Sequence, residues 1–214
     1  MNSNDDNIQA PSRKDREREK HRIDILDAAE RVFVRDGMAT KIETIAKEAE
    51  YAVGSIYNFF SGKDDLFRNV LLRISQLRID DLDALLPDVL DAPWAGIGKV
   101  VRFWLAHHVR HGDFLHVAMS QRSARSASIF PPNDPVEIAL TKNGEAYRER
   151  MLRFFTALAQ AREARPLDPG VMSVAFEGYV RTALFRAFRQ GRGKIDVAAL
   201  EAEVTADLQQ LFSR

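Results

Sequence analysis

Apolar side chains recur at helical spacing along almost the whole chain of 214 residues. Near its end, for example, Leu200, Val204, Leu208 and Leu211 follow one another at steps of four, four and three. Such spacing places side chains on one face of a helix, and no segment shows the two-residue alternation of a half-buried strand. No internal repeat is present either. We therefore predict an all-α fold of about nine helices.

Composition excludes several classes of protein. The longest uncharged stretch, Tyr51–Gly62, has 12 residues, whereas a helix needs about 18–20 apolar residues to span a bilayer. The absence of cysteine excludes disulfides, thiolate metal sites and a cysteine nucleophile. The first residues lack the apolar core of a secretory signal, so we expect a cytoplasmic protein. Basic and acidic residues both number 31, so any nucleic-acid binding must depend on a local patch.

One local patch lies near the N-terminus, where residues 13–22 read RKDREREKHR, with six basic and three acidic side chains. Two interpretations stay open. The segment is either a solvated, salt-bridged start of a helix or a basic arm that contacts a phosphate backbone. The polar residues before it are expected to be disordered. The apolar helical pattern itself begins at Ile23.

Residues 23–66 combine a long helix, two short helices and the start of another helix. The first helix is expected to end at Gly37, and the second short helix to span Val53–Phe60. Capping boxes are expected where a helix starts, at Thr40 with Glu43 and at Ser61 with Asp64. Two short helices joined by a tight turn are typical of a helix-turn-helix, whose second helix enters the major groove of DNA. The uncharged run Tyr51–Gly62 suits a helix that lies between phosphate walls.

The text of this region resembles the DNA-binding part of the TetR family of transcriptional regulators. Two stretches carry the resemblance, ILDAAERVFVRDG and TKIETIAKEAEYAVGSIYNFFSGKDDL. They cover about 45 of the 214 residues. The matching elements are Ala28, Ala29, Phe33, Gly37, Thr40, Ile45, Ala46, Ala49, Gly54, Ser55, Ile56, Tyr57, Phe60, Ser61, Gly62, Lys63 and Leu66.

The resemblance implies a three-helix DNA-binding domain followed by a larger helical domain for ligand binding and dimerisation. We expect a disordered or basic arm over residues 1–17, the helix-turn-helix over 18–65 and the larger domain over 66–214. The implied function is a ligand-responsive regulator, a repressor that binds a palindromic operator as a homodimer and is released by a small apolar or aromatic inducer. The implied partners are double-stranded DNA and that inducer, with no membrane, no cofactor and no enzymatic activity.

Candidate DNA-contacting residues follow from the same resemblance and from side-chain chemistry. Base-edge contacts are expected from Ala52, Val53, Ser55 and Asn58, because an asparagine amide can pair with adenine and an apolar group can contact the thymine methyl. Phosphate contacts are expected from Thr40, Tyr57 and Lys63. The alternative for each of these residues is an ordinary role in helix capping, packing or solvation.

Three residues depart from the family pattern at the turn. Glu50 occupies the usual glycine position, where a left-handed backbone would strain a residue with a Cβ. Tyr51 replaces a small buried valine, and Ala52 replaces the serine that usually caps the recognition helix. An alternative function is therefore a helical small-molecule-binding protein whose DNA binding is weakened.

The C-terminal part is rich in aromatic residues. Candidate ligand-binding residues are Phe103, Trp104, His107, Phe114, Tyr147, Phe155 and Tyr179. Aromatic residues at helical spacing also form plain core, and that alternative stays open. His107 and His111 lie four apart and suggest a metal pair, but no second ligand pair accompanies them. A metal-dependent enzyme is thus an alternative without a supporting motif, and we predict no metal site.

Helix boundaries in this part are predicted from prolines, glycines and caps. Pro87 and Pro93 are expected to interrupt the chain, and residues 95–110 and 113–125 to form separate helices. A loop is expected at 126–135, a break or helix start at Asn143-Gly144, helix starts at Asp168 and Asp196, and a helix end at Gly191 and Gly193. The homodimer is expected to form through the last two helices, with Gly178, Leu184, Phe188, Val204, Leu208 and Leu211 on the interface.

Overall fold

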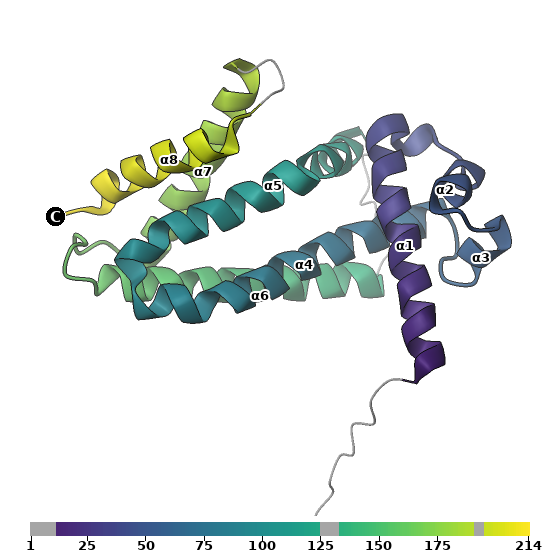
Figure 1. Cartoon of the computed structure of the whole chain (residues 1–214), viewed down its shortest axis with the longest axis horizontal. Coiled ribbons are helices and arrows are strands. Elements are labelled where there is room, and N and C mark those ends of the chain that lie inside the picture. The colour runs from purple at the N-terminus through teal and green to yellow at the C-terminus, as the bar shows by residue number, and fades with distance from the viewer. Residues whose placement is uncertain (1–11, 125–132, 191–194) are drawn as a thin grey trace, which may run out of the picture. The chain divides into compact units, whose positions relative to one another are not determined.

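The computed structural model describes residues 12–124, 133–190 and 195–214 (Figure 1). Within these ranges the chain forms eight α-helices and one short 3-10 helix, with no strand. The prediction of an all-α fold is confirmed. In chain order the elements are α1 (Arg13–Asp36), η1 (Gly37–Ala39), α2 (Ile42–Ala49), α3 (Val53–Tyr57), α4 (Lys63–Asp91), α5 (Pro93–Ala124), α6 (Pro135–Ala159), α7 (Pro169–Gln190) and α8 (Val197–Phe212).

The chain divides into two compact units, Met1–Val70 and Leu71–Arg214. The long helix α4 contributes its first residues to the first unit and the rest to the second. Within the described ranges, no helix is both long enough and apolar enough to cross a bilayer.

In the first unit, α1 begins at Arg13, well before the apolar pattern that starts at Ile23. Its start is fixed by Ser12, whose hydroxyl accepts a hydrogen bond from the Asp15 amide at 3.2 Å. The Asp15 carboxylate accepts one in return from the Ser12 amide, also at 3.2 Å. This reciprocal capping box satisfies amides that the helix cannot pair internally. Polar capping therefore extends the helix where apolar periodicity is absent.

The core of the first unit is formed where α1 packs against α2. The buried face of α1 includes Ile25, Ala29 and Phe33, and it ends at Gly37, whose φ of 65° suits a glycine. The Phe33 ring meets Phe67 of α4 edge to face at 5.1 Å. Buried side chains of α2, α3 and α4 complete this core: Ile42, Ile45, Ala46, Ile56, Leu66 and Val70.

The expected capping boxes differ in detail. The N-cap of α2 is Lys41 rather than Thr40, and no side chain caps this helix, so the prediction for Thr40 with Glu43 is wrong. The Ser61 amide and hydroxyl donate to Asp65 Oδ2 at 2.8 and 3.1 Å. Ser61 therefore pairs with Asp65 in place of the expected Asp64.

In the second unit, α5 packs against α8, α6 against α7, and α7 against α8. These helices and the second part of α4 share one apolar core. Its largest fully buried side chains include Phe154, Phe155, Phe176 and Phe212. The glycine at Gly96 is required by packing, because a Cβ there would lie 2.9 Å from the Val89 Cβ. The α4–α5 corner is thus a close approach of two helices.

The predicted helix breaks in this unit are mostly wrong. Pro87 lies inside α4, which continues to Asp91, and Pro93 opens α5. Leu82, Leu86 and Val89 are buried on both sides of Pro87, so packing maintains the helix despite the missing amide. The residues predicted as two helices at 95–110 and 113–125 form the single helix α5, and α6 continues through Asn143 and Gly144.

The predicted caps of the last helices are confirmed. Asp168 Oδ1 accepts from the Val171 amide, and Asp196 Oδ1 from the Ala199 amide, each at 3.0 Å. Other predictions lie outside the described residues. These are the disorder expected at residues 1–11, most of the loop expected at 126–135, and the helix end at Gly191 and Gly193.

Candidate functional site

The turn between α2 and α3 contains the first unusual residue. Glu50 ends α2 in the left-handed region, with φ 61° and ψ 32°. This is the backbone geometry expected at that position, and a residue with a Cβ is strained there by about 1–3 kcal/mol. The exposed Glu50 side chain adds a negative charge beside the start of α3.

Helix α3 is shorter than predicted and begins without a side-chain cap. Its N-cap is Ala52, which offers no oxygen to the free amides of the first turn. The helix covers Val53–Tyr57, and the chain then continues in a turn in which the Phe60 amide donates to Ile56 O at 2.9 Å. Ile56 and Phe60 are buried and hold α3 against the unit.

The side chains expected to contact DNA differ in exposure. Ala52, Tyr57 and Asn58 are exposed, and Tyr57 retains 56% of its accessible surface. Val53 and Ser55 are half-buried. Together these five residues form an uncharged surface, which we call the α3 face.

Thr40, in contrast, is buried, and its Oγ1 is covered by other atoms without a hydrogen-bond partner among the described residues. A covered hydroxyl cannot reach a phosphate. We therefore remove Thr40 from the candidate contacts.

Lys63 has a structural role that the sequence did not indicate. Its Nζ donates to Met38 O at 2.5 Å and to Thr40 O at 2.9 Å. These carbonyls lie in and just after the 3-10 helix, so Lys63 ties the start of α4 to the segment that leads into α2. An ammonium group has three donors, which leaves one for a phosphate.

Tyr51 also has a partner that sequence reasoning missed. Its hydroxyl donates to Asp24 Oδ2 at 3.1 Å, and its ring lies 5.1 Å from the His21 ring. Burial raises the pKa of Tyr51, and the hydrogen bond to Asp24 raises it further. The only signal in the sequence was a large residue where the family has a small one.

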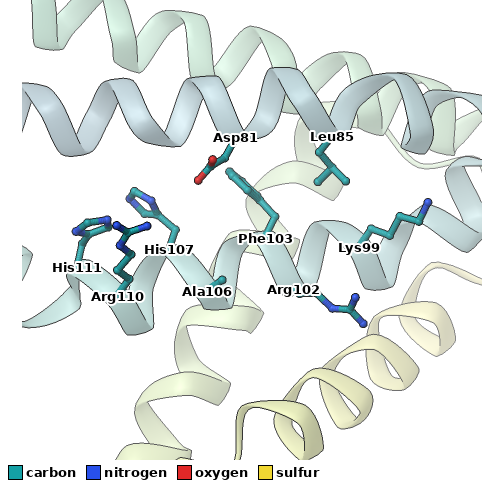
Figure 2. A pocket seen from close by; sticks show the side chains of 9 residues that line it. All are labelled: Asp81, Leu85, Lys99, Arg102, Phe103, Ala106, His107, Arg110 and His111. Atoms are coloured by element: carbon teal, nitrogen blue, oxygen red, sulfur yellow. The ribbon is translucent and has the colours of Figure 1, made fainter.

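The second unit contains a pocket of about 410 Å³ between α4 and α5 (Figure 2). Helix α4 supplies Asp81 and Leu85, and α5 supplies the other lining residues. These are Lys99, Arg102, Phe103, Ala106, His107, Arg110 and His111. Phe103 and His107 thus line this pocket, as two of the seven residues predicted to bind ligand.

The other five predicted ligand residues lie elsewhere. Trp104, Tyr147 and Phe155 are buried in the apolar core of the second unit. Phe114 is fully buried, and Tyr179 is half-buried with its hydroxyl bonded to Asp207. Aromatic residues at helical spacing produce the same sequence pattern whether they form core or line a pocket.

The histidines at one end of the pocket are buried and neutral. His107 and His111 retain 6% and 4% of their accessible surface, and their ring centroids lie 5.2 Å apart. Burial, together with neighbouring His108 and Arg78, lowers the pKa of His107 to about 3. Burial likewise lowers the pKa of His108 to about 4. No group of three or more potential metal ligands is found among the described residues.

Arg78 is a further polar residue near this end of the second unit. Its guanidinium lies 4.0 Å from the centroid of the Tyr147 ring, and its Nε is buried without a hydrogen-bond partner among the described residues. The sequence did carry a signal for it. Arg78 interrupts an apolar series at steps of four, between Ile74 and Leu82.

Comparison with known proteins gives this geometry its context. Residues 25–70 match the sequence profile of the family described as "Bacterial regulatory proteins, tetR family". This match covers α1 from Ile25 onward, α2, α3 and the start of α4.

Solved structures extend the likeness over nearly the whole chain. A Mesorhizobium loti protein assigned to the TetR family of transcriptional regulators has a TM-score of 0.71 at 16% identity, with 95% of this chain and 100% of that chain covered. The regulator FadR from Bacillus subtilis, solved with stearoyl-CoA, has a TM-score of 0.64 at 18% identity, with 87% and 97% covered. The SmeT–triclosan complex has a TM-score of 0.62 at 20% identity, with 91% and 92% covered. SmeT is the repressor of the Stenotrophomonas maltophilia efflux pump SmeDEF.

The sequence match includes the helix-turn-helix, and the structural likeness shows the fold of both units. The chain is therefore a TetR-family protein, with an N-terminal helix-turn-helix unit and a larger helical unit in the TetR-like fold.

Proposed function

We propose that this protein is a transcriptional repressor that binds a palindromic operator as a homodimer and leaves it when a small molecule binds. The observation that carries this proposal is the α3 face, an exposed and uncharged surface on the second helix of a helix-turn-helix. Asn58 and Ser55 supply the polar groups that base edges can pair with. Tyr57 and Lys63 are the proposed phosphate contacts, which position the helix.

A dimer is needed because one short recognition helix makes few base contacts, whereas two helices read two half-sites. Exposed apolar residues on α7 support an interface there: Val171, Val174, Phe185 and Phe188. Gly178 lies among them, with nothing within 4 Å of a built Cβ. Two residues expected at this interface, Val204 and Leu208, are buried in the core and cannot contribute. Leu211 of α8 is exposed and stays in the proposed set.

The proposed inducer site is the pocket between α4 and α5. Leu85 and Phe103 offer an apolar wall, and the buried His107 and His111 offer uncharged polar groups at one end. Its volume lies within the range of ligand sites, about 300–1,000 Å³. The structures of FadR with stearoyl-CoA and of SmeT with triclosan support a ligand in this fold. We propose a small apolar or aromatic compound.

Release requires the inducer to bind the non-operator conformation more tightly, since equal affinity for both would shift nothing. Helix α4 is the proposed transmitter, because it begins just after α3 and also carries Asp81 and Leu85 of the pocket. A ligand that moves α4 at the pocket thereby changes the support of α3.

The test is a fluorescence-anisotropy titration of the full chain against DNA fragments from beside its own gene and against random DNA of equal length. Specific binding is typically tighter than non-specific binding by a factor of about 10³ or more. Binding to one fragment with such a preference, reversed by a compound found in a thermal-shift screen, is the expected result. Equal affinity for all fragments would contradict the proposal.

A second candidate function is a small-molecule-binding protein with weakened DNA binding. The left-handed Glu50 and the missing cap at Ala52 favour it. The double variant Glu50→Gly, Ala52→Ser separates the two candidates. A wild-type chain that ignores every fragment, beside a variant that binds one, would support the second candidate. We propose no enzymatic activity for either.

A further inference from the structure

The first two turns of α1 extend its core-facing side with basic residues. Lys14 and Arg18 are exposed, whereas Ile25 and Ala29 further along are fully buried. Because an α-helix repeats every 3.6 residues, steps of four, seven and four place these four side chains on the same face. This face therefore changes from apolar to cationic towards the N-terminus of the helix.

The cationic part of this face lies beside the end of the recognition helix. The Arg18 guanidinium carbon is 5.7 Å from the centroid of the Phe59 ring, and Phe59 directly follows Asn58. Arg22, one turn further, is 5.8 Å from the Phe60 ring and donates to Asn69 at 3.1 Å. These contacts fix α1 against the turn that leaves α3.

The acidic residues of this segment are largely engaged by partners within α1. Asp15 forms the capping box with Ser12. Glu17 pairs with Arg13 at 2.8 Å, and Glu19 with Arg22 at 3.5 Å. Within the described part of the chain, neither Lys14 nor Arg18 has an ion-pair partner. The positive charge of this face is therefore available to an anionic partner.

We propose that Lys14 and Arg18 bind the DNA backbone beside the major groove that α3 enters, an inference that depends on the proposed DNA-binding function. The major groove is about 12 Å wide, so a cation close to the end of the recognition helix lies near a phosphate wall. Such contacts carry no base information. They add affinity for operator and random DNA alike and make the affinity more sensitive to salt.

The test compares two double variants of the full chain. Lys14→Ala, Arg18→Ala removes the cationic face, and the matched control Arg13→Ala, Lys20→Ala removes the same charge from the opposite side of the same helix. All four residues are exposed. For each variant, anisotropy titrations on operator and random DNA are repeated over a series of salt concentrations, and circular dichroism checks the helical content.

The first variant is expected to lose about tenfold or more in affinity for both DNAs, and its salt slope is expected to fall by about two, one per lost phosphate contact. The control is expected to keep the wild-type slope. Equal losses in both variants would overturn the inference, because general charge would then explain the effect. Unchanged affinity in the first variant would also overturn it while leaving the proposed function intact. A wild-type chain without DNA binding would contradict the proposed function itself.

Discussion

The Tyr51 hydroxyl donates a hydrogen bond to Asp24 across 3.1 Å, and this bond ties the turn of the helix-turn-helix to α1. Such a bond contributes about 1 kcal/mol. Tyr51→Phe removes it and leaves the ring in place, so the free energy of unfolding is expected to fall by about 1 kcal/mol. Urea denaturation followed by circular dichroism measures this change.

Tyr57→Phe is the matched control, because Tyr57 is 56% exposed and no hydrogen bond of its hydroxyl is found within the described part of the chain. It should leave stability unchanged while weakening DNA binding, as expected for a lost phosphate contact. If both phenylalanine variants were equally stable, the bond between Tyr51 and Asp24 would contribute nothing in solution.

Glu50 and Ala52 offer two stabilising substitutions at the turn. Glu50→Gly relieves a left-handed residue and should raise the free energy of unfolding by about 1 kcal/mol. Ala52→Ser supplies the missing cap of α3 and should add about 0.5–2 kcal/mol. Both gains are measurable by denaturant titration. A loss of stability in Glu50→Gly would show that its side chain makes a contact worth more than the strain.

Lys63 and Asn58 are expected to behave differently on DNA. Lys63→Ala should weaken binding to operator and random DNA equally, and it should also lower stability, because its ammonium group donates to Met38 O and Thr40 O. Asn58→Ala should instead narrow the difference between the two DNAs by about 1–3 kcal/mol, without a change in stability. Anisotropy and thermal melting of the same samples separate these effects. An unchanged difference in Asn58→Ala would remove Asn58 from the base contacts.

Local rules of sequence predicted the first unit well and its long-range contacts poorly. Gly37 at the end of α1 and the left-handed geometry at Glu50 both follow from short patterns. Tyr51 and Asp24 are 27 residues apart, and Lys63 reaches Met38 over 25 residues. No short pattern encodes such pairs. The start of α1 was missed for another reason, because it depends on the capping of Ser12 and not on apolar spacing.

In the second unit, local breaking signals were overestimated. Pro87 and Gly112 both lie inside helices, because the apolar residues around them are buried in one core. Phe103 and Trp104 show the same limit at the site. They are neighbours in sequence and equally aromatic, yet Phe103 lines the pocket and Trp104 belongs to the core. Only the rotation of α5 against its neighbours decides between these fates.

Stability should decrease as the pH falls below neutral, because His107 and His108 are held neutral in the folded chain. Their pKa values are lowered to about 3 and about 4, while a histidine in an unfolded chain has a pKa of about 6.5. Between these values the unfolded chain binds more protons, so each histidine lowers stability by up to about 1.4 kcal/mol per pH unit as the pH falls.

Urea titrations between pH 7 and pH 4 test this dependence. His107→Gln should flatten the curve, and His116→Gln, at an exposed position, should not. A wild-type curve without a slope in this range would show that His107 is protonated in the folded chain.

The proposed dimer interface predicts that a charge on α7 separates the protomers. Phe185 is 63% exposed on the same side of α7 as Val174, which is 75% exposed. Two-fold symmetry would bring the same patch of both protomers together, so Phe185→Asp would bury two like charges without partners. We expect this variant to be monomeric at micromolar concentration in light scattering, and to lose operator affinity because single half-sites add too few contacts. Ile138→Asp is the control, since Ile138 is 49% exposed on α6. Dissociation by the control alone would place the interface on α6, and a dimeric Phe185→Asp would remove α7 from it.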